Sequence, residues 1–220
     1  MIIGLKHPKY LYKHEAMNNG KHNGAYYYAK EIEENIIPLI KTDYNWVTIH
    51  VPGEYVDHSI IFIHSNVDFE KYKELANHKD LILVSSNYDT TKYMERFGKS
   101  IFLPLSVDVE YVRKFSVAKK TEELCYAGNM WPFKEADLKK YVPKEAHCFI
   151  NVPRNELLAE LAKYKVCYAI GRTAIEARIL GCELRVCDHR YPDTDFWQVL
   201  DNREAAEILR NELKKVGAAS

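Results

Sequence analysis

The residues best suited to chemistry lie in one stretch, 168–187, which reads as a strand, a tight turn, a helix and another strand. Gly171, Arg172 and Thr173 stand where the helix is expected to begin. The first N–H groups of a helix lack partners within it and the helix dipole is positive there, so such a start suits a phosphate. Arg172 would add a fork of donors, and Thr173 a hydroxyl.

Glu176 follows about one turn further along the same helix. A carboxylate at that distance from a phosphate site can accept hydrogen bonds from the two hydroxyls of a ribose. The stretch therefore predicts a site for a nucleoside diphosphate, with Arg172 stabilising the charge of a departing diphosphate. An ordinary strand–helix–strand unit is the alternative, in which Gly171 and Gly181 only form turns and Glu176 lies in solvent.

Two residues in the first half of the chain are candidates for a general base. His64 ends an apolar run that begins at Ser59, and a side chain at the carboxyl end of a parallel strand points to where α/β proteins bind ligands. Its imidazole would titrate near neutral pH. Glu54, after Pro52-Gly53, is the rival base. The alternative for His64 is a histidine that satisfies the backbone of a turn.

The composition is that of an ordinary globular protein. The 220 residues carry a formal net charge of zero, which gives no strong electrostatic drive towards nucleic acid or anionic membranes but leaves a local basic patch open. No apolar run approaches the ~20 residues that span a bilayer, and the N-terminus does not resemble a signal peptide. The five cysteines form no CxxC pair, which fits reduced core residues of a cytoplasmic protein rather than a metal site.

Strand-like and helical segments alternate along most of the chain, which predicts parallel sheets covered by helices on both faces. We expect two Rossmann-like α/β domains, residues 1–112 and 113–200, with a final helix in 201–220 that returns to pack on the first. Asp108 is expected to cap a helix or turn. The expected strands are 2–6, 46–51, 59–64, 81–85 and 101–105 in the first domain, and 123–127, 147–150, 166–170 and 184–188 in the second.

The run 171–177, Gly-Arg-Thr-Ala-Ile-Glu-Ala, resembles the donor-binding segment of the GT-B glycosyltransferases. In that family a helix start holds the diphosphate of a nucleotide sugar, and a glutamate on the helix holds the ribose. The run 125–134 is similar to another family segment, in which a strand ends in glycine and a cation then reaches the diphosphate. The resemblance implies that Gly128 is this glycine and Lys134 this cation, with Asn129 near the sugar or phosphate.

The first half shows a weaker resemblance to the acceptor domain of the same family. Residues 18–24 would form the loop that shapes the acceptor side, and His64 matches a histidine at the cleft. The run 84–108, a Val-Ser, a helix and a Pro-x-x-Val-Asp, is similar to the segment that closes the first domain. The sequence departs from many retaining members at Tyr168, where they carry a glutamate eight residues before the ribose glutamate.

The resemblance implies a glycosyltransferase with a cleft between its domains. The donor would be a nucleotide-diphosphate sugar, linked to uridine or guanosine, and no cofactor or metal is expected. The closest match to a metal-binding Asp-x-Asp motif, Asp193-Thr-Asp195, is expected in a loop. The acceptor hydroxyl would belong to a small molecule, a glycan or, in a compact viral enzyme, a modified DNA base. A nucleotide-sugar epimerase and a non-catalytic nucleotide-binding protein are the alternatives.

Overall fold

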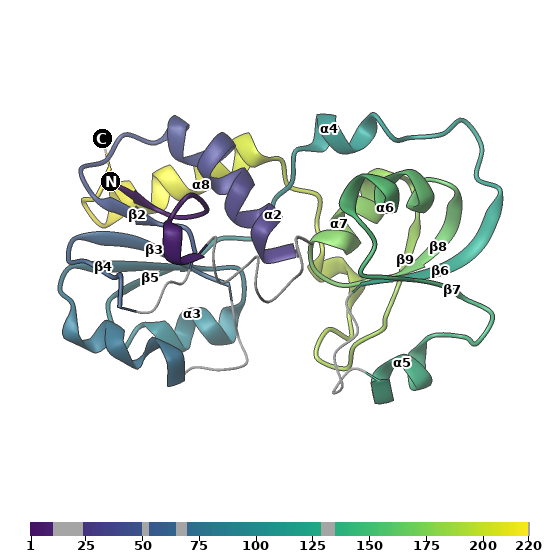
Figure 1. The fold of residues 1–220 in the computed structure, drawn as a ribbon, viewed down its shortest axis with the longest axis horizontal. Coiled ribbons are helices and arrows are strands. Elements are labelled where there is room, and N and C mark those ends of the chain that lie inside the picture. The colour runs from purple at the N-terminus through teal and green to yellow at the C-terminus, as the bar shows by residue number, and fades with distance from the viewer. Residues whose placement is uncertain (11–23, 50–52, 65–69, 129–134, 220) are drawn as a thin grey trace. The chain divides into compact units, whose positions relative to one another are not determined.

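The structure is a computed structural model that describes residues 1–10, 24–49, 53–64, 70–128 and 135–219 (Figure 1). The chain divides into two compact units. Unit 1 combines Met1–Pro104 with Asn202–Ser220, and unit 2 is Leu105–Asp201. Each unit is an α/β structure around a sheet of parallel strands. This architecture agrees with the expectation of two Rossmann-like domains.

The described part of unit 1 holds a five-stranded parallel sheet in the order β1-β2-β3-β4-β5. The strands β3 and β4 are buried along their whole length and form the centre of the sheet. Their runs of Ile, Leu, Val and Phe are typical of strands covered on both faces. The strands are β1 (Ile2–Ile3), β2 (Asn45–Val47), β3 (Ser59–Ile63), β4 (Leu81–Ser85) and β5 (Lys99–Phe102).

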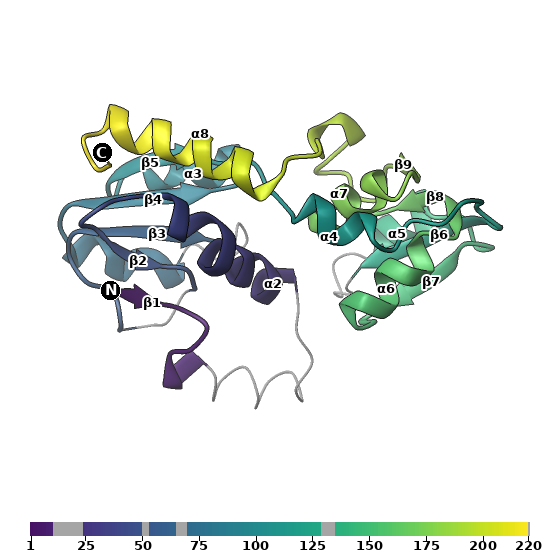
Figure 2. The same cartoon turned by 90° about the horizontal axis from the view of Figure 1, so that it is seen from above.

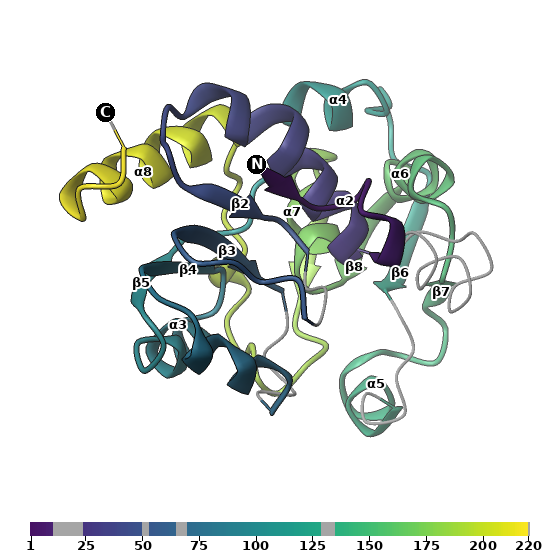
Figure 3. The same cartoon turned by 60° about the vertical axis from the view of Figure 1, so that its left-hand side comes forward.

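Helices cover both faces of this sheet. On one face lie α2 (Gly24–Glu31), which continues into the π-helical turn η1 (Ile32–Ile36) and η2 (Ile37–Leu39), and the C-terminal α8 (Asn202–Lys215). Figures 1 and 3 show α3 (Tyr88–Met94) on the opposite face. The apolar side of α8 packs against η1 and η2, and Figure 2 shows it running along this unit. The 3-10 helix η3 (Glu70–Asn77) connects β3 to β4.

The described part of unit 2 holds a four-stranded parallel sheet in the order β7-β6-β8-β9. Its strands are β6 (Glu122–Gly128), β7 (His147–Ile150), β8 (Tyr164–Tyr168) and β9 (Glu183–Arg185). Figure 1 shows α5 (Glu135–Tyr141) on one face and α6 (Arg154–Leu161) and α7 (Arg172–Ile179) on the other. The short helices α4 (Val109–Arg113) and η5 (Thr194–Phe196) complete the unit.

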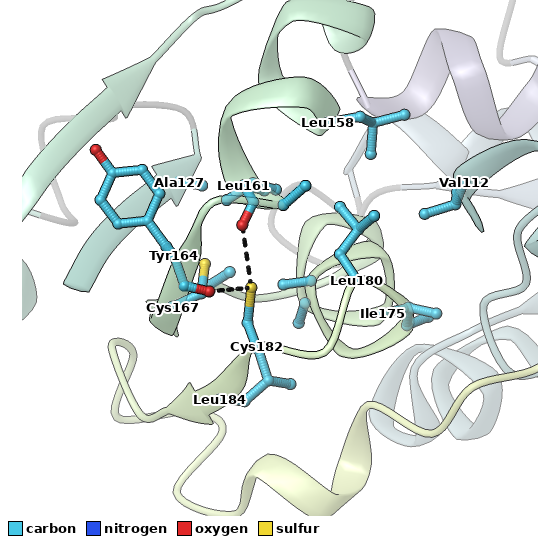
Figure 4. Packing of buried hydrophobic residues seen from close by; sticks show 14 of the residues in the cluster. Val112, Ala127, Leu158, Leu161, Tyr164, Cys167, Ile175, Leu180, Cys182 and Leu184 are labelled. Carbon is cyan, nitrogen blue, oxygen red and sulfur yellow. Dashed lines mark hydrogen bonds between the residues drawn. The ribbon is translucent and has the colours of Figure 1, made fainter. Parts of the chain in front are cut away.

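The core of unit 2 lies between the sheet and the pair α6 and α7 (Figure 4). Leu158 and Leu161 of α6 and Ile175 of α7 are fully or almost fully buried in it. Cys182 lies 3.4 Å from the carbonyl oxygens of Leu161 and Tyr164, so its thiol has backbone acceptors within reach. All five cysteines are free, and four of them are buried.

The boundary between the units differs from the expected division after residue 112. The segment that begins at Leu105 already belongs to unit 2, because Val107, Val109 and Val112 are buried in the core of that unit. Asp108 caps α4 by accepting a hydrogen bond from the N–H of Tyr111 at 2.8 Å, which confirms its expected role. In the described ranges, no helix combines the length and the apolar character needed to cross a bilayer.

Candidate functional site

The strand order of unit 2 marks one edge of its sheet as the candidate ligand site. The chain leaves β6 towards β7 on one side, and leaves β8 towards β9 on the other, so the connections diverge between β6 and β8. Ligands of open α/β sheets bind at the carboxyl ends of the strands where the connections diverge. The pairing of Tyr126 with Tyr168 brings Gly128, at the end of β6, beside the residues that lead into Gly171.

Both glycines predicted for the site have a structural need to be glycine. Gly171 precedes α7 with φ 65° and ψ −144°, a conformation that side chains with a Cβ rarely adopt. A Cβ on Gly171 would meet no atom within 4 Å, so its backbone and not crowding requires glycine. A Cβ on Gly128 would lie 2.8 Å from the hydroxyl of Tyr126. Thr173 is half-buried in the first turn of α7.

The carboxylate of Glu176 lies between two guanidinium groups. Arg154, the first residue of α6, places its Nε and Nη2 at 3.0 and 2.9 Å from Glu176 Oε1. Arg172 donates to the same oxygen at 3.3 Å and contacts the carbonyl of Ser106 at 3.5 Å. Glu176 is only 3% exposed, so the alternative that leaves it in solvent is wrong. We call Arg154, Arg172 and Glu176 the arginine–glutamate cluster.

This cluster has the electrostatics of an anion site. Two guanidinium groups and one carboxylate leave one net positive charge, and the side chains of Arg154 and Arg172 are 12% and 8% exposed. Both arginines also begin helices, whose first N–H groups favour an anion. Arg154 was not predicted as a site residue. The sequence shows that it starts a helix after a strand, as Arg172 does, but not that it reaches Glu176.

A second polar group lies near the carboxyl end of β9. Asp188 is 2% exposed, and its two oxygens receive the Nε and Nη2 of Arg190 at 2.9 and 2.6 Å. His189 Nδ1 lies 2.7 Å from Asp137 Oδ2, and this contact lowers the pKa of Asp137. Asp137, Asp188 and His189 have possible metal-ligand atoms within 4.8 Å of one another. Because each carboxylate already has a nitrogen partner, ion pairing accounts for the group.

The closest match to an Asp-x-Asp motif serves the local loop. Asp193 caps η5 by accepting from the N–H of Asp195 at 2.8 Å. Asp195 in turn pairs with Arg178 of α7 at 3.1 Å. Both carboxylates therefore hold the segment after β9 in place, which agrees with their expected position in a loop.

His64 lies at the carboxyl end of β3 in unit 1. Its Nε2 is 2.5 Å from the backbone carbonyl of Thr48, and its ring meets the ring of Tyr28 edge-on at 5.4 Å. A carbonyl oxygen only accepts hydrogen bonds, so Nε2 carries the hydrogen and Nδ1 is the basic nitrogen of the neutral ring. His64 thus bonds a backbone group, as in the structural alternative.

Glu54, the rival base, already has two partners. It forms an ion pair with Lys9, and His7 Nε2 lies 3.5 Å from its Oε2. The Lys9 ammonium, with a smaller effect of His7, lowers the pKa of Glu54. A carboxylate with a lowered pKa is a weaker base, so this geometry favours His64 over Glu54.

Glu33 is a further polar residue at the carboxyl edge of the first sheet. Its Oε1 accepts from the N–H of Leu5 at 2.9 Å and from the hydroxyl of Thr48. A side chain on Gly4 would collide with this carboxylate, which explains the glycine after β1. Glu33 belongs to the π-helical turn η1. Nothing in the sequence pattern indicated this contact, because it depends on the distortion of the helix.

Several predicted residues lie outside the described ranges, namely Asn129, Lys134 and residues 18–23 of the expected acceptor loop. No protein-family model, curated protein or solved structure matches the chain.

Proposed function

We propose that the chain is a GT-B-type glycosyltransferase. It moves a sugar from a uridine- or guanosine-linked nucleotide-diphosphate donor to an acceptor hydroxyl. The main support is the arginine–glutamate cluster, with its net positive charge, at the start of α7 beside the diverging strands β6 and β8. A cationic helix start at this position suits the diphosphate of a nucleotide.

In the proposed donor complex, the backbone N–H groups after Gly171 and the guanidinium of Arg172 hold the diphosphate. Gly128 allows the backbone to approach the diphosphate closely, and Thr173 donates its hydroxyl to the diphosphate. Glu176 accepts hydrogen bonds from the ribose hydroxyls. Asn129 and Lys134 follow Gly128 in the chain and add contacts to the sugar and the diphosphate. These groups stabilise the negative charge that develops on the leaving diphosphate, so the proposal needs no divalent metal.

In the proposed reaction, His64 is the general base of unit 1. The acceptor oxygen attacks the anomeric carbon of the sugar, and the bond from that carbon to the diphosphate oxygen breaks. The hydroxyl proton goes to the imidazole of His64, whose Nε2 contacts the carbonyl of Thr48. The electron pair of the broken bond leaves with the diphosphate, near Arg172.

The turnover test compares the wild type with His64→Gln and Glu54→Gln. The measured quantity is the release of nucleoside diphosphate from UDP- and GDP-sugars, with and without a panel of hydroxyl acceptors. We expect acceptor-dependent release that falls roughly 100-fold or more in His64→Gln, since general-base catalysis contributes 10²- to 10⁴-fold. Glu54→Gln should retain most of it.

Two outcomes would favour the alternatives. Conversion of the sugar without any acceptor would indicate an epimerase. Binding of the nucleotide sugar with no turnover in the wild type would indicate a non-catalytic binding protein. Equal turnover by wild type and His64→Gln would remove His64 from the mechanism.

A further inference from the structure

The two carboxylate oxygens of Glu176 have different surroundings. All three guanidinium contacts, two from Arg154 and one from Arg172, are made to Oε1. Within the described parts of the chain, Oε2 has no hydrogen bond or ion pair. The guanidinium contacts therefore engage one carboxylate oxygen, Oε1, and leave Oε2 without a guanidinium partner.

Arg154 is itself held by its neighbours. Its guanidinium lies over the ring of Tyr111 at 5.5 Å, a distance at which a cation and an aromatic face attract. The hydroxyl of Tyr111 donates to Asn155 Oδ1 at 2.6 Å, which ties the ring to the residue after Arg154. The guanidinium thus donates to Glu176 Oε1 through Nε, and its Nη2 lies at ion-pair distance from the same oxygen.

We propose that Arg154 is a positioning residue that sets the ribose specificity of the site. It acts through Glu176. By holding Oε1 through the hydrogen bond from Nε and the ion pair with Nη2, it restricts the carboxylate and keeps Oε2 for the ribose hydroxyls of the nucleoside diphosphate. The inference rests on the proposed function, because it assumes that a nucleotide binds at the start of α7.

The consequence is discrimination between ribose and deoxyribose. A hydrogen bond from a ribose hydroxyl to a carboxylate is charge-assisted and so stronger than one between neutral groups. Its loss costs roughly 10- to 100-fold in affinity, so the wild type should bind a ribonucleoside diphosphate that much more tightly than its 2′-deoxy form. If the carboxylate of Glu176 can rotate, most of the preference for ribose over deoxyribose is lost, because the orientation that accepts from the ribose hydroxyl is then only one of several.

The experiment is titration calorimetry of the full chain with UDP, dUDP, GDP and dGDP. The variants are Arg154→Gln and Arg154→Lys. The glutamine removes the charge and the planar guanidinium group, whereas the lysine keeps the charge alone. Arg178→Gln is the matched control, because Arg178 lies on α7 yet bonds Thr194 and Asp195 instead of Glu176. Thermal unfolding of each variant without ligand checks that it is folded.

We expect a ribose preference of roughly 10-fold or more in the wild type and in Arg178→Gln. It should fall below about 3-fold in Arg154→Gln and to an intermediate value in Arg154→Lys, which loses the fork. An unchanged preference in folded Arg154 variants would overturn the inference and leave the proposed function standing. Equal affinity of the wild type for ribose and deoxyribose forms would do the same. No binding of any diphosphate by the wild type would overturn both.

Discussion

At the scale of single residues, the chemistry of the site depends on how charges are shared. Glu176 is surrounded by two guanidinium groups and is almost fully buried. Removing one partner of a buried ion pair typically costs about 3–5 kcal/mol, because the remaining charge stays uncompensated. The second arginine changes this balance, since loss of either one leaves Glu176 with a cationic partner.

The proximity of Glu176 and Arg172 followed from the sequence, because both lie on one helix four residues apart. The part played by Arg154 did not. It lies 22 residues before Glu176 and reaches it only through the packing of α6 beside α7. Local spacing carries no information about such a contact.

A residue-scale prediction concerns His58 and Asp80 of unit 1, whose side chains lie 2.6 Å apart. Asp80, with smaller help from Asp43, raises the pKa of His58, and His58 followed by Tyr44 lowers the pKa of Asp80. Because the pKa of Asp80 is lowered in the folded state, its contribution to stability is lost as the pH falls through that pKa. Because the pKa of His58 is raised, its contribution to stability is lost as the pH rises through that pKa. The pair therefore contributes fully between pH 3.8 and 6.5, the ordinary values of the two groups.

The measurement is urea unfolding of the wild type and Asp80→Asn at pH 5.5, 7 and 8.5. Asparagine tolerates the positive φ of 54° at position 80, so the charge is the main change. We expect the stability difference between the two proteins to be largest at pH 5.5 and to shrink towards pH 8.5. The control Asp43→Asn should show a weaker dependence, because Asp43 is 83% exposed. A difference that stays constant with pH would contradict this account.

At the scale of elements, the turn between β8 and α7 positions the site. Gly171, with its positive φ, turns the chain between β8 and α7. The first N–H groups of α7 therefore lie at the carboxyl edge of the sheet. This turn was predicted from the glycine alone. The sequence also indicated most strands of both sheets, because their apolar runs are bounded by polar turns. It indicated a helix or turn cap at Asp108 but did not define α4, which packs on α7.

The element-scale prediction is that Gly171→Ala strains the turn. The φ of 65° with ψ of −144° should cost about 1–3 kcal/mol for a residue with a Cβ. No atom lies within 4 Å of the added Cβ, so the loss would come from the backbone. Gly24→Ala is the matched control, because its Cβ also meets nothing and it lies in α2, where alanine is favoured. Denaturant unfolding that shows no loss for Gly171→Ala would contradict the proposed strain.

At the scale of the whole molecule, two parallel sheets were predictable, but their strand orders were not. Alternating strands and helices imply parallel sheets, whereas the choice of neighbours depends on pairings between distant segments. Unit 2 places β6 between β7 and β8, which creates the diverging connections, and unit 1 keeps its strands in chain order. The expected boundary after residue 112 was late, because the valines after Pro104 are buried in the core of unit 2.

The central claim is that the arginine–glutamate cluster and the start of α7 bind a nucleoside diphosphate. Its most direct test is thermal unfolding of the full chain with a panel of nucleoside diphosphates and their sugars. A ligand at 100 times its Kd stabilises the folded state by about 2.7 kcal/mol, which amounts to a shift of several degrees.

The panel is run on the wild type, on Glu176→Gln and on the control Glu183→Gln, an exposed glutamate of β9 in the same unit. The account predicts stabilisation of the wild type and of Glu183→Gln by one base class, uridine or guanosine, with most of the shift lost in Glu176→Gln. Absence of a shift with every nucleotide, or a full shift in Glu176→Gln, would contradict it.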